Sequence, residues 1–217
     1  MPRNMPIPDD ATLTRRGHAV TQPDGRILVL ACGALAREIL ALIDLNGWSH
    51  VDLHCLPAIL HNRPDRIPDA VEQAVTQHRP GYARIFVAYA DCGTGGLLQA
   101  TCDRLGVQMI AGAHCYAFFD GLAAFAARDE VTAFYLTDFL ARQFDTFVWK
   151  PLGLDRHPEL RDMYFGNYDR LVYLAQTEDA ALTEQARACA ERLGLTFERR
   201  FTGYGDLATE LARGLLA

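Results

Sequence analysis

The sequence of 217 residues predicts an α/β fold with an open doubly wound, Rossmann-like sheet that is mainly parallel. Two patterns predict it. Short continuous apolar runs are typical of buried parallel strands, and the segments between them carry apolar residues at helical spacing. Strands that alternate with helices imply right-handed crossovers and a sheet covered on both faces.

The elements of the first part follow one another in a regular order. Residues 1–25 are expected to form a flexible arm that closes with a Pro-Asp-Gly turn. Strands are then expected at 26–33, 50–55, 84–90 and 107–112, and helices at 34–47, 67–78 and 94–106. We therefore expect residues 26–128 to form an α/β unit that carries the functional site.

Residues 129–217 are expected to form a C-terminal α/β part packed on the first unit, either within one sheet or as a smaller second lobe. Residues 131–144 read as a strand passing into a helix, and residues 150–170 as a long polar connection. A strand, helix, strand and helix are expected at 170–177, 178–194, 195–203 and 204–217.

Composition excludes several classes of function. A formal net charge of −6 argues against nucleic-acid binding, which needs a clustered basic surface. No apolar stretch is long enough to cross a bilayer, and the polar start lacks the apolar core of a signal peptide. We therefore expect a cytoplasmic protein that acts on a small molecule or binds a protein, and that has no membrane partner.

The six cysteines separate into two groups by position. In a reducing compartment they are not expected to form structural disulfides. Cys102 and Cys189 fall on apolar helix faces, where a cysteine behaves as a small hydrophobe. Cys32, Cys92 and Cys115 each come at the end of a predicted strand, and ligands bind at this edge of an open α/β sheet. We expect these three thiols to share one site.

The segment Asp-Cys-Gly-Thr-Gly-Gly at 91–96 is the centre of that prediction. Gly93 and Gly95, together with Gly33 after the first strand, would let the backbone approach a bound group. The expected helix start at 94 would stabilise a Cys92 thiolate, the form needed by both a metal ligand and a nucleophile. The segment matches neither a phosphate loop nor a complete dinucleotide fingerprint, and no C-x-x-C pair occurs.

The fourth ligand stays open between His114, His54 and Cys55. Three thiolates with one histidine would close a structural zinc site. Three thiolates with an open position would leave zinc, iron or an iron-sulfur cluster free to bind substrate. Strand alternation places His54 on the opposite face from Cys55, which favours a role for His54 outside the site.

A second cluster, in the 150–170 connection, could bind the substrate. Its candidates are Lys150, Arg156, His157 and Tyr164, since the two cations suit a carboxylate or phosphate group. A solvated loop held by its aromatic residues is an equally good interpretation of this segment.

Four segments in this order carry a resemblance to a family: LACGAL, LPAILHNRPDRIP, YADCGTGG and AGAHCYAFF. Together they resemble domain-of-unknown-function family 1638. The resemblance implies that Cys32, Cys92 and the His114-Cys115 pair are metal-binding positions, with His61 and Asn62 in a nearby loop. Asn62 is a further candidate for binding the substrate. Many relatives read His-Asp-Cys where this chain reads His114-Cys115. The resemblance also implies a link to corrinoid-dependent methyltransferase systems and one-carbon metabolism.

Three functions remain in order of preference. The first is a metal-dependent enzyme, with zinc or iron, that acts on a small polar molecule. The second is metal binding without turnover, by a metallochaperone or an accessory protein. The third is a cofactor-free enzyme of racemase-like or hydrolytic type, with Cys92 as nucleophile and His114 as its base. A racemase needs one cysteine from each lobe, and the C-terminal part offers only Cys189.

Overall fold

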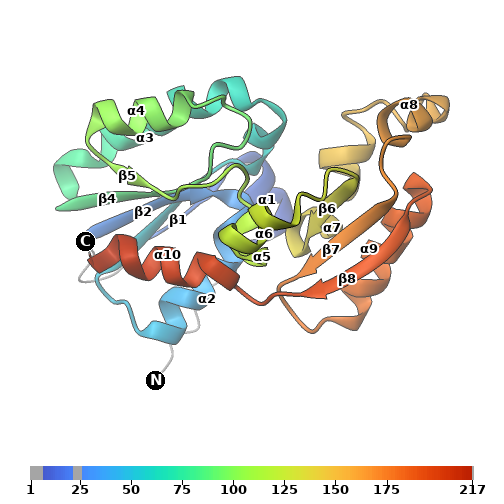
Figure 1. Ribbon diagram of the computed structural model, residues 1–217. Helices are drawn as coiled ribbons and strands as arrows, with labels where there is room; N and C mark the ends of the chain where they lie inside the picture. The colour runs from blue at the N-terminus through green and yellow to red at the C-terminus, as the bar shows by residue number, and fades with distance from the viewer. Residues whose placement is uncertain (1–6, 22–25, 217) are drawn as a thin grey trace. The chain divides into compact units, whose positions relative to one another are not determined.

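The computed structural model describes residues 7–21 and 26–216, and the chain divides into two compact units (Figure 1). The first unit contains the described residues up to Cys115 together with 207–216, and the second contains Tyr116–Asp206. Each unit has its own sheet, so the predicted mixed α/β fold is confirmed. We expected the division near residue 128. It falls earlier because 116–128 contribute helices to the second unit, and the end of the chain returns to the first.

The first sheet has five strands in the order β1-β3-β2-β4-β5. The strands are β1 (His18–Val20), β2 (Ile27–Cys32), β3 (Val51–Leu56), β4 (Arg84–Ala88) and β5 (Gln108–Met109). All neighbours are parallel except β1, which runs antiparallel to β3. The four parallel strands are the four that the sequence predicts.

The strand β2 lies between two parallel partners, and all six of its residues are buried, as its unbroken apolar run predicts. The chain passes from β2 to β3 on one side and later to β4 on the other side. The carboxyl ends of β2 and β4 therefore flank the point where the strand order reverses. Ligands in open α/β sheets bind in the crevice at this switch point.

Helices cover both faces of the first sheet. Figure 1 shows α3 (Ile67–His78) and α4 (Leu97–Leu105) on one face, and α2 (Ala36–Asn46) and α10 (Gly205–Leu216) on the other. The last helix packs closely, because a Cβ on Gly214 would lie 2.3 Å from the Phe86 ring. Arg84 also donates to the Gly214 carbonyl at 2.9 Å.

The N-terminal segment differs from the flexible arm that we expected. It contains α1 (Asp10–Arg15), whose first turn is capped by the Asp9 carboxylate accepting from the Thr12 N–H at 2.8 Å. It then forms β1, which adds an edge strand to β3. The turn expected at 23–25 and the first six residues lie outside the described residues.

The second unit is a three-stranded parallel sheet in the order β6-β7-β8. Its strands are β6 (Ala133–Thr137), β7 (Arg170–Ala175) and β8 (Thr196–Phe201), and its helices are α5 (Ala117–Asp120), α6 (Leu122–Arg128), α7 (Asp138–Arg142), α8 (Arg161–Phe165) and α9 (Ala180–Leu193). The predicted strand-helix passage at 131–144 is confirmed. The connection that we expected at 150–170 contains a short 3-10 helix, Pro158–Leu160, and then α8.

Short 3-10 helices link several elements of the first unit: Gly33–Leu35, Ala58–Asn62, Pro64–Arg66 and Arg79–Gly81. In the second unit a single π-helical turn, Asp145–Trp149, follows α7. Across residues 7–21 and 26–216, none of the helices combines the length and the apolar composition needed to span a membrane.

Candidate functional site

Two loops at the carboxyl edge of the first sheet bring Cys92 and Cys115 together. The N–H of Asp91 donates to the Gly112 carbonyl at 2.9 Å, and the N–H of Cys92 donates to the Ala113 carbonyl at 2.8 Å. These bonds continue the parallel pairing of β4 and β5 beyond the strand ends. The two thiols therefore arrive side by side although 23 positions separate them.

The Sγ atoms of Cys92 and Cys115 lie 2.9 Å apart, and both residues are partly exposed. The Ala90 N–H also points at the Cys115 sulfur, at 3.5 Å. The hydrogen bond from the Cys115 thiol lowers the pKa of Cys92, with help from the N–H groups of Cys115 and Ala90. The same bond and burial raise the pKa of Cys115. Cys92 is therefore the more readily ionised thiol of the pair, and Cys115 the less readily ionised one.

The third predicted thiol, Cys32, lies beside this pair but deeper in the sheet. It is 7% exposed, and burial raises its pKa to about 12, so it remains a thiol. Its charge would interact with those of Cys92 and Cys115. Cys55, which is also buried, would interact with Cys32. The structure thus places the three strand-end cysteines in one region of the first unit.

Tyr89 lies among these thiols and was not predicted. Its ring is fully buried, and its hydroxyl makes no hydrogen bond of ordinary geometry with any residue that the structure describes. Its pKa is raised by burial and then by the neighbouring cysteines, Cys32 foremost. The hydroxyl does interact with the Cys32 thiol, whose pKa this contact lowers against the larger effect of burial. In the sequence, the signal that Tyr89 carries is its position near the end of the apolar run at 84–90.

The loop at 91–96 is built around the Asp91 carboxylate. This group accepts from the Thr94 hydroxyl at 2.7 Å and from the N–H groups of Gly95 and Gly96 at 3.1 and 2.7 Å. The hydrogen bond from Thr94 is the main reason that the pKa of Asp91 is lowered. Cys92 itself has a φ of 50°, a conformation that non-glycine residues rarely adopt. A fixed turn therefore presents its thiol.

The start of α4 corrects one part of the prediction. The helix begins at Leu97, with Gly96 as its N-cap, rather than at Thr94. Cys92 is therefore too far from the first turn for the helix dipole to act on it strongly, since that effect fades within one turn. Its thiolate is stabilised instead by Cys115 and by loop N–H groups.

His114 and His61 lie near the Asp91 loop. The Asp91 charge acts on His114, whose pKa is nevertheless lowered by desolvation. The pKa of His61 is lowered by desolvation and by the neighbouring His114. Of the two adjacent candidates His114 and Cys115, it is Cys115 that contacts Cys92. His54 instead stacks edge-on against His78, with ring centroids 4.7 Å apart, which agrees with its placement on the other strand face.

Within the described residues, no three His, Cys, Asp or Glu side chains are already arranged to hold a metal ion. The structure brings the sulfur atoms of Cys92 and Cys115 into contact, and the buried Cys32 lies near them. Tetrahedral zinc with Zn–S bonds near 2.3 Å places its sulfur ligands roughly 3.8 Å apart. Cys92 and Cys115 would have to separate by about 1 Å to share such an ion.

The local backbone accounts for glycine at each position predicted to bind a cofactor. A Cβ on Gly33 would lie 2.6 Å from the Leu13 carbonyl oxygen, so this position holds α1 close to the end of β2. Gly93 and Gly95 adopt φ values of 83° and 65° within the Asp91 loop. Asn62 ends the 3-10 helix that also carries His61, in the same unit as the thiols.

Of the five residues predicted to bind substrate, Asn62 belongs to the first unit together with the thiols. The other four, Lys150, Arg156, His157 and Tyr164, belong to the second unit. Arg156 lies 3.9 Å from Asp155, and His157 lies 3.2 Å from Glu159, both as exposed ion pairs. Tyr164 is 39% exposed. These contacts are those of a solvated surface segment, the alternative interpretation of this cluster.

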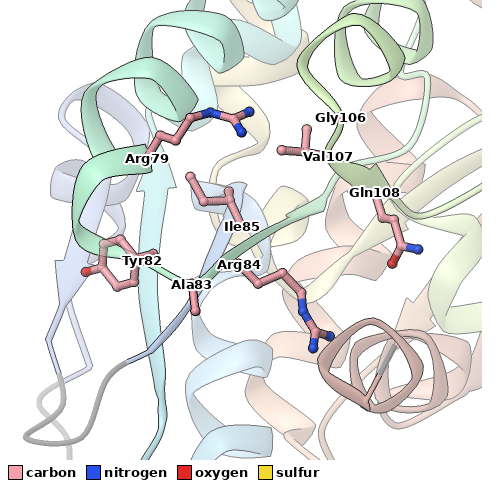
Figure 2. Close-up of a pocket in the computed structure, with 8 residues that line it drawn as sticks. All are labelled: Arg79, Tyr82, Ala83, Arg84, Ile85, Gly106, Val107 and Gln108. Carbon is pink, nitrogen blue, oxygen red and sulfur yellow. The ribbon is translucent and has the colours of Figure 1, made fainter.

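A pocket of about 270 Å³ lies at the amino-terminal end of β4, away from the thiols. Figure 2 shows that the Arg79 and Arg84 side chains extend in different directions there. Arg79 donates to the Leu105 carbonyl at the end of α4, and Arg84 donates to Gly214 near the end of α10. Each cation thus satisfies the carboxyl end of a helix, which is a structural role. The thiol cluster remains the candidate site.

Comparison with protein families gives one match, to a family described as "Protein of unknown function (DUF1638)", over residues 55–211. The match covers more than half of the chain. The chain belongs to this family. Cys92, His114 and Cys115 fall inside the DUF1638 match, whereas Cys32 and β2 precede it. No curated protein and no solved structure matched the chain.

Proposed function

We propose that this protein binds a soft metal ion, zinc or iron, through Cys92 and Cys115 and acts with it on a small polar molecule in the cytoplasm. The contact of 2.9 Å between two partly exposed thiols at the switch point of the sheet is the main support for this proposal. Thiolate sulfur is the ligand that such ions prefer.

Cys32 is the third ligand in this proposal, and His114 the candidate fourth. Cys32 already interacts electrostatically with both members of the pair. The Tyr89 hydroxyl, which interacts with the Cys32 thiol, would then lie beside the ligand sulfurs and could hydrogen-bond to one of them. An iron-sulfur cluster is an alternative occupant with the same ligands.

The chemistry that a bound zinc ion supplies is the activation of an oxygen or sulfur atom of the substrate. The chain's own contribution is the carboxyl edge of the first sheet, where Asp91, His114 and His61 lie around the thiol pair. The resemblance to DUF1638 extends the proposal to methyl transfer in corrinoid-linked one-carbon metabolism, because thiolate-bound zinc suits a thiol or hydroxyl acceptor.

Metal analysis of protein purified without oxygen tests the proposal. We expect near-stoichiometric zinc or iron in the natural protein, and its loss in Cys92→Ser and Cys115→Ser. Cys102→Ser is the matched control, because Cys102 is a fully buried cysteine of α4 and should not affect the metal content. Folded natural protein that takes up no zinc, iron or cobalt when these are supplied would rule the proposal out.

A second candidate is a metal-free enzyme in which the Cys92 thiolate is the nucleophile. The observation that favours it is the division of roles within the pair, with the pKa of Cys92 lowered and that of Cys115 raised. A racemase arrangement finds little support, since Cys189 of the second unit is 4% exposed within α9. Stoichiometric labelling of Cys92 by a carbonyl electrophile in metal-free protein would favour this candidate.

A further inference from the structure

We infer that Cys92 and Cys115 form a reversible disulfide when the protein meets a peroxide, which makes this pair a site of oxidative modification. The inference goes beyond the proposed function and does not depend on it, because it needs only the two sulfur atoms. The distance between them, 2.9 Å, is the observation that carries it.

The geometry requires little movement. A disulfide bond is about 2.05 Å long, so the sulfur atoms need to approach by about 0.9 Å. Both cysteines lie on loops beyond the strand ends, where side-chain rotation does not disturb the ladder of β4 and β5. The backbone bonds from Asp91 to Gly112 and from Cys92 to Ala113 already hold the two loops together.

The other cysteines are less suited to the reaction. Cys102 and Cys189 are buried in helices of different units, and Cys55 is buried within β3. Cys32 is near the pair but 7% exposed, so a peroxide has poorer access to it. Cys92 and Cys115 are the two that are partly exposed.

The reaction balances with hydrogen peroxide as the oxidant. The Cys92 sulfur attacks one peroxide oxygen, the O–O bond breaks, and a sulfenic acid and one water form. The Cys115 sulfur then attacks the Cys92 sulfur and displaces the second water as the S–S bond forms. The two thiols lose two electrons and two protons in total, and the peroxide is reduced to two waters. A dithiol reductant reverses the bond by exchange.

The consequence for the site follows from the ligand set. A disulfide removes both of the partly exposed sulfur ligands at once, and Cys32 alone does not hold an ion. Oxidation would therefore switch off the proposed metal site, whereas the peroxide reaction itself proceeds in protein that holds no metal.

The test uses full-length protein, treated with a chelator and then with one equivalent of hydrogen peroxide. We expect two of the six thiols to disappear, the intact mass to fall by two hydrogen atoms, and both changes to reverse with dithiothreitol. Metal content is measured separately, so failure of the metal proposal leaves this result unaffected.

Tryptic mapping locates the bond, because cleavage after Arg84, Arg104 and Arg128 places the two cysteines in separate peptides, 85–104 and 105–128. The first peptide also contains Cys102, so the mapping is done in a Cys102→Ala background, which should form the bond as readily as the natural protein. Cys92→Ser, Cys92→Ala and Cys115→Ser should each lose it while keeping the natural melting temperature.

Three results would overturn the inference. The first is a thiol count that does not change under peroxide. The second is a Cys92 that becomes sulfenic or sulfinic acid without a link to the 105–128 peptide. The third is a link from Cys92 to Cys32.

Discussion

At the scale of single residues, the hydrogen bond between Cys92 and Cys115 decides which sulfur is reactive. The two sulfur atoms are 2.9 Å apart, and the hydrogen bond between them lowers the pKa of Cys92 and raises that of Cys115. The difference does not come from exposure, since both residues are partly exposed. It comes from the hydrogen bond between the two sulfur atoms and from the N–H groups of Cys115 and Ala90, which favour the ionised form of Cys92.

Removing that donor should make Cys92 less reactive. In metal-free Cys115→Ala protein, we expect iodoacetamide to alkylate Cys92 roughly tenfold more slowly at neutral pH, because a hydrogen bond to a charged group is lost. The sign follows from the pKa: a lowered value gives more thiolate at neutral pH, and its loss moves the rate profile to higher pH. Mass spectrometry of peptide 85–104 over about pH 6 to 9 measures the profile.

Cys102→Ala serves as the control for that experiment and should leave the Cys92 profile unchanged. If the midpoint of the pH–rate profile of Cys92 is unchanged in Cys115→Ala, the loop N–H groups alone stabilise the thiolate. In that case Cys115 would have no electrostatic role in the pair.

The residues of the site differ in how well the sequence could predict them. Cys32, Cys92 and Cys115 were predicted because parallel strands end at a common edge, which fixes their neighbourhood without any side-chain detail. The 2.9 Å contact could not be predicted, since it depends on the loop bonds to Gly112 and Ala113. The hydroxyl of Tyr89 was missed because an aromatic residue in an apolar run normally signals only core packing.

At the scale of elements, one carboxylate ties together the three strands of the second sheet. Glu130, just before β6, accepts from the Tyr135 hydroxyl and pairs with Arg170 of β7 and Arg200 of β8 at 3.2 and 3.3 Å. The hydrogen bond from Tyr135 and the two arginines lower the pKa of Glu130 to about 2. The ionised Glu130 carboxylate thereby helps to hold the three strands of this sheet together.

Glu130→Gln should destabilise the protein at neutral pH by about 1–2 kcal/mol, since two arginines lose a partly buried counter-ion. The folded pKa is about 2 and the ordinary value is 4.5. The stabilisation is therefore complete above 4.5 and disappears as the pH falls from 4.5 to about 2. Urea unfolding of both proteins across this range should show the difference shrinking on acidification.

The control is Glu184→Gln, which removes an exposed carboxylate paired with Arg187 at 3.5 Å and should change stability very little. A Glu130→Gln penalty of equal size at pH 2 and pH 7 would show that packing, rather than charge, explains it.

The elements of regular α/β units were predictable, whereas short edge elements were not. The strand β2 is an unbroken apolar run, β4 is one after Arg84, and β3 alternates apolar residues with Asp52 and His54. The helices between them have a clear apolar face. By contrast, α1 and β1 are only six and three residues long. They form because β3 offers an open edge and because Gly17 allows a close approach to the Cys55 carbonyl. Such tertiary contacts leave little trace in local sequence.

At the scale of the whole molecule, the chain crosses from the first unit to the second and back again. Its last helix, α10, extends beyond the second unit and covers a face of the first sheet (Figure 1). Leu207, Leu211 and Leu215 of this helix are buried, and Gly214 lies against Phe86 of β4. The strand that leads to the Cys92 loop is therefore supported by the far end of the sequence.

Leu211→Asp should weaken the first unit and leave the second sheet intact. Leu211 is fully buried in α10, whereas Leu216 of the same helix is 86% exposed, so Leu216→Asp is a matched control. A carboxylate at position 211 should cost about 3–5 kcal/mol, and one at 216 no more than about 0.5 kcal/mol. Hydrogen exchange followed by mass spectrometry measures both effects strand by strand.

We expect faster exchange in β2 and β4 of the Leu211→Asp protein, with β6 and β7 protected as in the natural protein. Because β4 leads directly into the loop at 91–96, the loosened first unit should also lose the fixed approach of Cys92 to Cys115. Peroxide should then form the Cys92–Cys115 disulfide more slowly. If exchange instead rises equally in both sheets, the two units unfold as one cooperative structure, and the thiol pair depends on the second sheet as much as on the first.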